Sequence, residues 1–144
     1  GGEPYVIEYN VRMGDPETEV VIPRLKNDLV ELLTAAGEKR LNEMTIKEDP
    51  RVALTVILAS GGYPGDFEKG MVITGTDQCE NSLLFHAGTA MKEGHLITSG
   101  GRVMAVTSFG NTITEAQATS MTNAAKVQFE KKYFRKDIGN DLIG

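Results

Sequence analysis

The run VALTVILAS at residues 52–60 limits the possible folds of this 144-residue chain more than any other stretch. It is apolar on both faces and rich in β-branched residues, a combination that is typical of a strand in the middle of a sheet. The ten residues that follow, 61–70, contain four glycines and a proline and must form a loop. The sequence therefore predicts a sheet built around one central strand.

Further strands are predicted beyond this loop. Short apolar runs at 71–75 and 83–89 have the length and composition of strands. Residues 95–110 have apolar stretches on both sides of Gly100–Gly101, and this pattern predicts a hairpin that turns at the two glycines. His86 falls within one of these apolar runs, where we expect a hydrogen-bonded core histidine rather than a catalytic base.

The last predicted element is a helix. Thr112 and Glu115 have the spacing of a capping box, in which two side chains satisfy backbone N–H groups at the start of a helix. We expect this helix to reach about Lys131, because apolar residues recur along one side of it: Ile113, Ala116, Ala124 and Val127. The second half of the chain is thus predicted as mostly antiparallel strands followed by a helix.

The N-terminal residues 4–13 alternate between apolar and polar side chains. One face of this segment carries Ile7, Tyr9 and Val11, and the other carries Glu8, Asn10 and Arg12. A period of two residues is the signature of a strand with one face in a core. We therefore predict a strand over residues 4–13.

Two helices are predicted after this strand. Asp15–Glu17 has the capping Asp, the proline and the acidic residue that favour a helix start. Because Pro23 cannot lie deep within that helix, we expect one or two turns and then a second helix from about Pro23, ending at Gly37. Its apolar stripe is Leu25, Leu29, Leu32, Leu33 and Ala36. Residues 38–50 are polar and are interpreted as a link or boundary.

Composition excludes several classes of protein. The net charge of −5 without a basic cluster argues against a nucleic-acid partner. Cys79 is the single cysteine, so an internal disulfide is impossible and a reducing compartment fits. No apolar run approaches the length of a membrane span, and we expect no membrane association. The first residues lack the pattern of a signal peptide.

The polar face of the N-terminal strand is the sharpest candidate site. In a strand, Glu8, Asn10 and Arg12 would follow one another at steps of about 7 Å on one face. A carboxylate and an amide oxygen are suitable ligands for Mg²⁺, and a guanidinium could stabilise charge on a transferring phosphoryl group. The alternative is the solvated polar face of an edge strand, and spacing alone leaves both open.

The segment Gly14–Glu17 also has two interpretations. Local rules favour a turn with Asp15 as a helix cap, whereas a functional Asp15 would need a substrate amine or hydroxyl within reach. The loops at 61–70 and 98–103 either approach a ligand through their backbones or only connect strands. The second of them is no phosphate-binding P-loop, because it lacks the glycine spacing and the Lys-Ser/Thr pair.

The segment EYNVRMGDPETEVV at residues 8–21 closely resembles the signature of the phosphoribosylamine–glycine ligases, which are ATP-grasp enzymes. Met13 stands where Phe or Leu is usual in that family, a change that conserves volume. Further segments resemble family blocks in the family order: 23–33, 59–70, 85–89, 98–110 and 135–139. The resemblance covers essentially the whole chain.

The resemblance implies an α+β fold in two parts. Residues 1–45 would be the C-terminal strand and helices of an ATP-grasp domain, and residues 46–144 a small antiparallel β barrel-sandwich domain with a C-terminal helix. It also implies a cytoplasmic ligase of de novo purine biosynthesis. In that reaction ATP phosphorylates the carboxylate of glycine, and the amine of 5-phosphoribosylamine attacks the resulting glycyl phosphate.

The same resemblance gives roles to four residues. Glu8 and Asn10 would bind the Mg²⁺ or Mn²⁺ that bridges the ATP phosphates, Arg12 would assist phosphoryl transfer, and Asp15 would line the substrate pocket. Family members are much longer than this chain, which begins without Met and almost at once in a strand pattern. We therefore expect a fragment that needs upstream domains as partners, binds ATP poorly and is inactive alone. The alternatives are another ATP-grasp ligase or carboxylase, or a non-catalytic packing domain.

Overall fold

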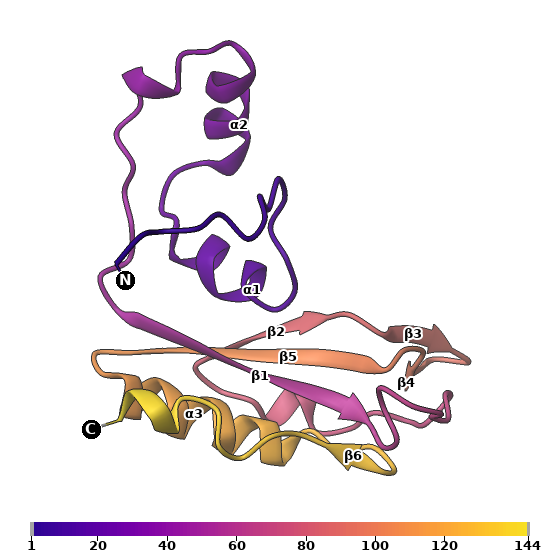
Figure 1. The fold of residues 1–144 in the computed structure, drawn as a ribbon. Helices are drawn as coiled ribbons and strands as arrows, with labels where there is room; N and C mark the ends of the chain where they lie inside the picture. The colour runs from indigo at the N-terminus through magenta and orange to yellow at the C-terminus, as the bar shows by residue number, and fades with distance from the viewer. Residues whose placement is uncertain (1, 144) are drawn as a thin grey trace.

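The computed structural model describes residues 2–143 and has an α+β architecture (Figure 1). A four-stranded antiparallel sheet has the order β2-β5-β1-β6, and β3 and β4 form a separate two-stranded sheet. The strands are β1 Val52–Ser60, β2 Ser82–His86, β3 Thr89–Lys92, β4 His95–Thr98, β5 Arg102–Gly110 and β6 Lys132–Tyr133. The helices are α1 Thr18–Val21, α2 Leu29–Gly37 and α3 Ile113–Lys126. Helix α3 covers one face of the sheet, and α1 lies over the other.

The predicted central strand is confirmed. β1 has the predicted bounds and pairs with β5 from Val52↔Gly110 to Leu58↔Met104, while its end pairs with β6. Val56 and Leu58 are fully buried on the face that α3 covers. The opposite face of β1 is only half-buried, so within this chain the strand is central in the sheet but covered more completely on one side.

Helix α3 begins as predicted and ends earlier. The Thr112 hydroxyl accepts a hydrogen bond from the Glu115 N–H at 3.2 Å, and the Glu115 carboxylate accepts one from the Asn111 N–H at 2.8 Å. The helix ends at Lys126 rather than Lys131, because the next residues leave the helical path. Gln128 exchanges two backbone hydrogen bonds of 2.9 Å with Thr74, which fixes it in a bridge to the preceding loop.

A chain of buried hydrogen bonds fixes α3 on the sheet. Asn123 Nδ2 lies 2.6 Å from Ser82 Oγ, which in turn lies 2.6 Å from Ser108 Oγ. Ser120 Oγ donates to the Leu54 carbonyl oxygen at 2.9 Å and lies 2.8 Å from Ser108 Oγ. Buried polar groups specify one packing arrangement when all of them are hydrogen-bonded. These contacts connect the helix to β1, β2 and β5 at a single level.

The predicted hairpin at 95–110 is wrong. β4 pairs with β3, and β5 pairs with β1 and β2, so the chain changes sheets at Gly100–Gly101. Ser60 holds both glycines beside the end of β1: its N–H donates to the Gly101 carbonyl at 2.8 Å, and its hydroxyl to the Gly100 carbonyl at 2.9 Å. β5 pairs instead with the long apolar strand β1, and Val56, Leu58 and Val106 of this pair are fully buried, which favours this pairing.

The other short strands also differ from their predicted bounds. The run at 83–89 is split between β2 and β3 at residues 87–88. Residues 71–75 do not form a continuous strand. They make two isolated β-bridges, Val72↔Ile97 and Thr74↔Gln128. His86 is exposed rather than in the core, and its Nδ1 lies 3.0 Å from Thr89 Oγ1.

The N-terminal strand is not formed within the described residues. Residues 2–11 are extended without a sheet neighbour, and Ile7 and Val11 are 97% and 94% exposed. A strand needs a paired neighbour, and residues 2–143 supply none here. The second helix begins at Leu29 rather than near Pro23, because Asp28 Oδ1 caps it by accepting from two backbone N–H groups at 2.8 and 3.1 Å.

Asp49 connects the N-terminal part to the start of β1. Its N–H donates to the Arg24 carbonyl at 2.7 Å, and Lys26 Nζ lies 3.6 Å from its carboxylate. Arg51 binds the same carboxylate through two side-chain hydrogen bonds of 3.0 and 2.8 Å. The side-chain and backbone hydrogen bonds from Arg51 hold the pKa of Asp49 well below its usual range.

This lowered pKa predicts a stability difference that depends on pH. The folded carboxyl stays ionised at pH values where the unfolded one, with a pKa of about 3.9, takes up a proton. Its contribution is therefore complete above about pH 5 and is lost as the pH falls further. Asp49→Asn should lower the urea midpoint at pH 7, and the gap to the unmodified chain should narrow toward pH 2. Asp66→Asn, at an exposed position, is the control, and a gap that widened in acid would contradict the assignment.

Candidate functional site

The Gly14–Glu17 segment forms a turn, and Asp15 does not cap a helix. The Gly14 N–H donates to the Glu17 carboxylate at 2.6 Å, and the Thr18 N–H to the Gly14 carbonyl at 3.2 Å. Residue Glu17 is the N-cap of α1, and no side chain caps that helix. The prediction of Asp15 as a cap is therefore wrong, and its carboxylate is available for other contacts.

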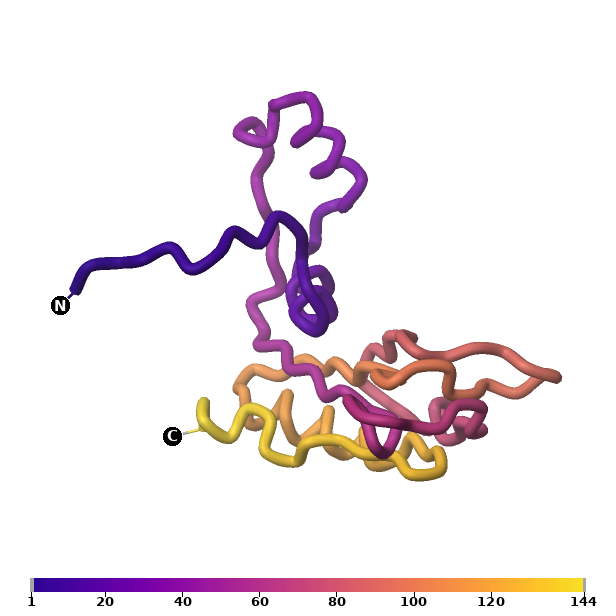
Figure 2. Tube along the Cα trace, turned by 45° about the vertical axis from the view of Figure 1, so that its right-hand side comes forward, coloured from indigo at the N-terminus to yellow at the C-terminus, as the bar shows by residue number. Residues whose placement is uncertain are grey.

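The structure brings the four predicted site residues together. Glu8, Asn10, Arg12 and Asp15 line one open cavity of about 700 Å³. The other residues of its wall are Met13, Gly14, Glu17, Thr18, Glu19 and Arg102. Figure 2 shows the first residues running away from the sheet, so one side of this cavity has no neighbouring element in the described chain.

Glu8 and Asn10 each offer a side-chain oxygen of the kind that coordinates metal ions. Asn10 Nδ2 donates a hydrogen bond of 3.2 Å to Glu8 Oε1, which leaves the amide carbonyl of Asn10 as an acceptor beside the carboxylate. No group of three or more His, Cys, Asp or Glu residues within 2–143 has the geometry to hold a metal ion. Two oxygens beside an open cavity fit a hard cation that takes its remaining ligands from phosphate oxygens and water, rather than one held in a closed protein site.

Arg102 also lines this cavity, although it is not among the site residues predicted from the sequence. Arg102 Nη1 donates to the Asp15 carbonyl at 3.1 Å and lies 3.5 Å from Asp15 Oδ1. Arg12, by contrast, donates a hydrogen bond of 3.3 Å to the carbonyl of the neighbouring Met13. In the sequence, Arg102 is a basic residue directly after two glycines at the start of a strand. This pattern alone does not indicate a site, because the contact with Asp15 arises only in the folded chain.

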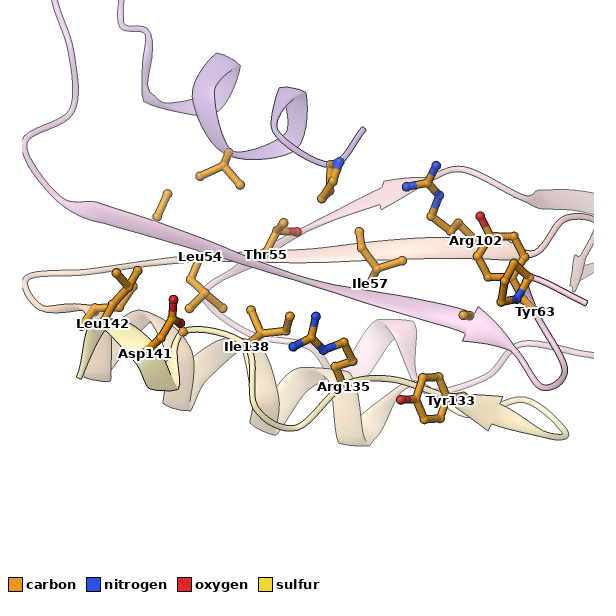
Figure 3. Close-up of a pocket in the computed structure, with 17 residues that line it drawn as sticks. Leu54, Thr55, Ile57, Tyr63, Arg102, Tyr133, Arg135, Ile138, Asp141 and Leu142 are labelled. Atoms are coloured by element: carbon orange, nitrogen blue, oxygen red, sulfur yellow. The ribbon is translucent and has the colours of Figure 1, made fainter. Parts of the chain in front are cut away.

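A second, apolar cavity of about 590 Å³ lies beside the first (Figure 3). Its floor is the half-buried face of β1, including Thr55 and Ile57, and Tyr63 stands at one end beside Arg102. Leu142, from the C-terminal segment, stands at the other end. Arg102 lines both cavities, so its side chain marks their boundary.

Two further features of the described chain concern the Cys79 thiol and the helices. Burial raises the pKa of the Cys79 thiol, which therefore is not poised as a thiolate nucleophile. None of the helices within residues 2–143 has the length and apolar character needed to cross a bilayer.

The fold and site define a class of protein: an antiparallel α+β domain that presents carboxylate, amide and guanidinium groups along an N-terminal segment. The family model for the phosphoribosylglycinamide synthetase C domain matches residues 53–141. The chain belongs to this family, so the family resemblance predicted from the sequence is confirmed.

Curated relatives and a solved structure agree with this family. The phosphoribosylamine–glycine ligase of Vibrio vulnificus (strain CMCP6) is 46% identical over 144 residues, which are 99% of this chain and 34% of that protein. The ligase of Pseudomonas putida is also 46% identical, with 99% and 33% coverage. The crystal structure of the ligase from Thermotoga maritima matches with a TM-score of 0.76 and 41% identity, over 95% of this chain and 34% of that one. The chain spans about a third of the length of the curated relatives it matches.

Proposed function

We propose that this chain supplies the C-terminal part of an ATP-dependent ligase that joins glycine to 5-phosphoribosylamine in de novo purine biosynthesis. The observation that carries the proposal is the convergence of Glu8, Asn10, Arg12 and Asp15 on one cavity. The similarity to phosphoribosylamine–glycine ligases supports the reaction class. In this proposal residues 1–45 end an ATP-grasp domain, residues 46–144 form the C-terminal β domain, and the reaction takes place in the cytoplasm.

Each residue has a role that its chemistry allows. The Glu8 carboxylate and the Asn10 carbonyl hold Mg²⁺ or Mn²⁺, and their mutual hydrogen bond keeps both groups in one orientation. When bound, the cation neutralises charge on the phosphates of the co-substrate ATP. Arg12 stabilises the negative charge of the transferring phosphoryl group. Asp15 accepts a hydrogen bond from the amine substrate and so orients it toward the activated carboxylate.

The exposed N-terminal segment supports a requirement for upstream domains. Tyr5, Ile7, Tyr9 and Val11 are between 84% and 97% exposed, although their spacing is that of a buried strand face. Isolated extended segments are not stable strands in water. Within the complete ligase, this segment pairs with a strand of the preceding portion, which also supplies the remaining walls of the cavity. The chain alone is therefore expected to be inactive.

A fusion protein tests the proposed function. The part of the Vibrio vulnificus ligase that precedes its region of similarity is joined to this chain, and ADP formation is measured with glycine and 5-phosphoribosylamine. We expect turnover that requires both substrates and Mg²⁺, because the fusion restores every wall of the cavity. Neither half should form ADP on its own.

Two outcomes of this experiment contradict the proposal. A folded fusion without turnover, tested beside the active Vibrio ligase, would leave a packing role as the function of the chain. ADP formation that responds to another carboxylate but not to glycine would indicate a different ATP-grasp ligase or carboxylase. Glycine-dependent ADP formation by the isolated chain would contradict the requirement for upstream domains.

A further inference from the structure

Arg102 connects the start of β5 to a turn 87 residues earlier in the chain. A single nitrogen, Nη1, donates to the backbone carbonyl of Asp15 and lies 3.5 Å from its carboxylate. We propose that Arg102 is a positioning residue that fixes the orientation of Asp15 toward the amine substrate. This inference rests on the proposed function, and it gives Arg102 a positioning role that acts through Asp15.

The backbone around Arg102 is built to hold this side chain in place. The pairing of β1 with β5 shifts between Leu58 and Ala59, so that Leu58 opposes Met104 and Ala59 opposes Arg102. This irregularity leaves Val103 as an extra residue, and such bulges near functional sites redirect neighbouring side chains. The Arg102 carbonyl accepts a hydrogen bond of 2.9 Å from the Gly88 N–H. The guanidinium therefore extends from a fixed point of the sheet.

The backbone directly before Arg102 is closely packed. A Cβ atom built at Gly101 would lie 2.0 Å from Tyr63 Cδ2, so the tyrosine ring packs directly on the backbone next to Arg102 (Figure 3). The polar cavity on the other side also contains the acidic residues Glu8, Glu17 and Glu19. Arg102 lies between these two environments and places a positive charge beside Asp15.

The turn itself does not hold the Asp15 carboxylate. Its internal hydrogen bonds join Gly14 to Glu17 and to Thr18, and none of them uses the side chain of Asp15. Removing the Arg102 side chain therefore frees the carboxylate while the turn and the sheet remain. The loss should appear in substrate binding and not in folding, since an exposed ion pair contributes little to stability.

A double-mutant cycle in the fusion protein separates positioning from direct action. Arg102→Met and Asp15→Asn should each raise the KM for 5-phosphoribosylamine about tenfold, with a smaller change in kcat. The double variant should be no worse than Asp15→Asn, because Arg102 acts through that residue. Arg102→Lys should restore part of the loss. Arg40→Met is the matched control, since Arg40 makes a similar exposed ion pair with Glu38 and lines neither cavity. Losses that multiply in the double variant would overturn the inference.

A second measurement on the 144-residue chain does not depend on activity. Arg102→Met should shift the backbone amide NMR signals of Asp15 and Glu17 and leave the melting temperature within about 2 °C. Arg40→Met should leave both signals in place. Unchanged Asp15 and Glu17 signals in Arg102→Met would overturn the positioning role. If these signals shift while the unmodified fusion forms no ADP, the proposed function fails but the structural coupling stands.

Discussion

Replacing Gly75 by alanine is expected to destabilise the chain by about 3 kcal/mol, well above the cost of the same change at Gly94. Both glycines have positive φ angles, +78° and +79°, which L-residues with a side chain rarely adopt. They differ in their surroundings: a Cβ at Gly75 would lie 2.2 Å from the Lys126 carbonyl oxygen, whereas a Cβ at Gly94 meets nothing within 4 Å. The backbone near Gly75 must therefore move as well.

This movement would disturb the end of helix α3. Residue Thr74, directly before Gly75, exchanges backbone hydrogen bonds with Gln128, and the Gly75 carbonyl accepts from the Gln78 N–H at 3.2 Å. Urea unfolding of the two variants measures the loss in free energy of unfolding, which should be about 1 kcal/mol for Gly94→Ala. In thermal unfolding, Gly75→Ala should lower the melting temperature by about 10 °C. Equal losses at the two positions would show that conformational strain alone, and not the contact with Lys126, decides the cost.

The elements that the sequence predicted well are those with complete local signals. β1 could be bounded because a continuous apolar run lies between a charged residue and a glycine-rich loop. The start of α3 could be located because Thr112 and Glu115 bind backbone N–H groups only a few residues away. In both cases the physical cause of the boundary lies within the element itself or directly beside it.

The elements that it predicted poorly depend on distant partners. Gly100–Gly101 has the composition of a hairpin turn, but Ser60, 40 residues earlier, decides its path. Residues 4–13 have the alternation of a strand, yet a strand forms only where a neighbour is available. The sequence of a segment shows whether it can form a strand or a turn. Whether it does so depends on the neighbours that the rest of the fold places beside it.

The same distinction applies to the candidate site. Glu8, Asn10 and Arg12 could be grouped from their spacing, since three residues within one extended segment remain close whatever the rest of the chain does. Arg102 could not be added, because its relation to Asp15 arises from the pairing of β1 with β5 and from the packing of α1 over that sheet. A site whose residues come from separate elements can be recognised only in the three-dimensional structure.

Removal of the Asn10 side chain should have the largest effect on activity. In the fusion protein, Asn10→Ala should lower kcat about 100-fold and raise the Mg²⁺ concentration needed for half-maximal activity about tenfold. The change removes one of the two proposed metal ligands and also the hydrogen bond from Asn10 to Glu8. Asn111→Ala, at an exposed position outside the cavity, is the matched control and should leave both quantities unchanged.

A further variant separates the two functions of Asn10. Asn10→Asp keeps an oxygen donor and loses the N–H that binds Glu8. If the cation is the main partner, Asn10→Asp should retain at least tenfold more activity than Asn10→Ala at saturating Mg²⁺, because the ion compensates the repulsion between the two carboxylates. If the main role of Asn10 is to orient Glu8, Asn10→Asp should be less active than Asn10→Ala. Without a cation between them, the two carboxylates would repel each other and move apart. An unchanged Mg²⁺ dependence in Asn10→Ala would remove Asn10 from the metal site altogether and leave its contact with Glu8 as its role.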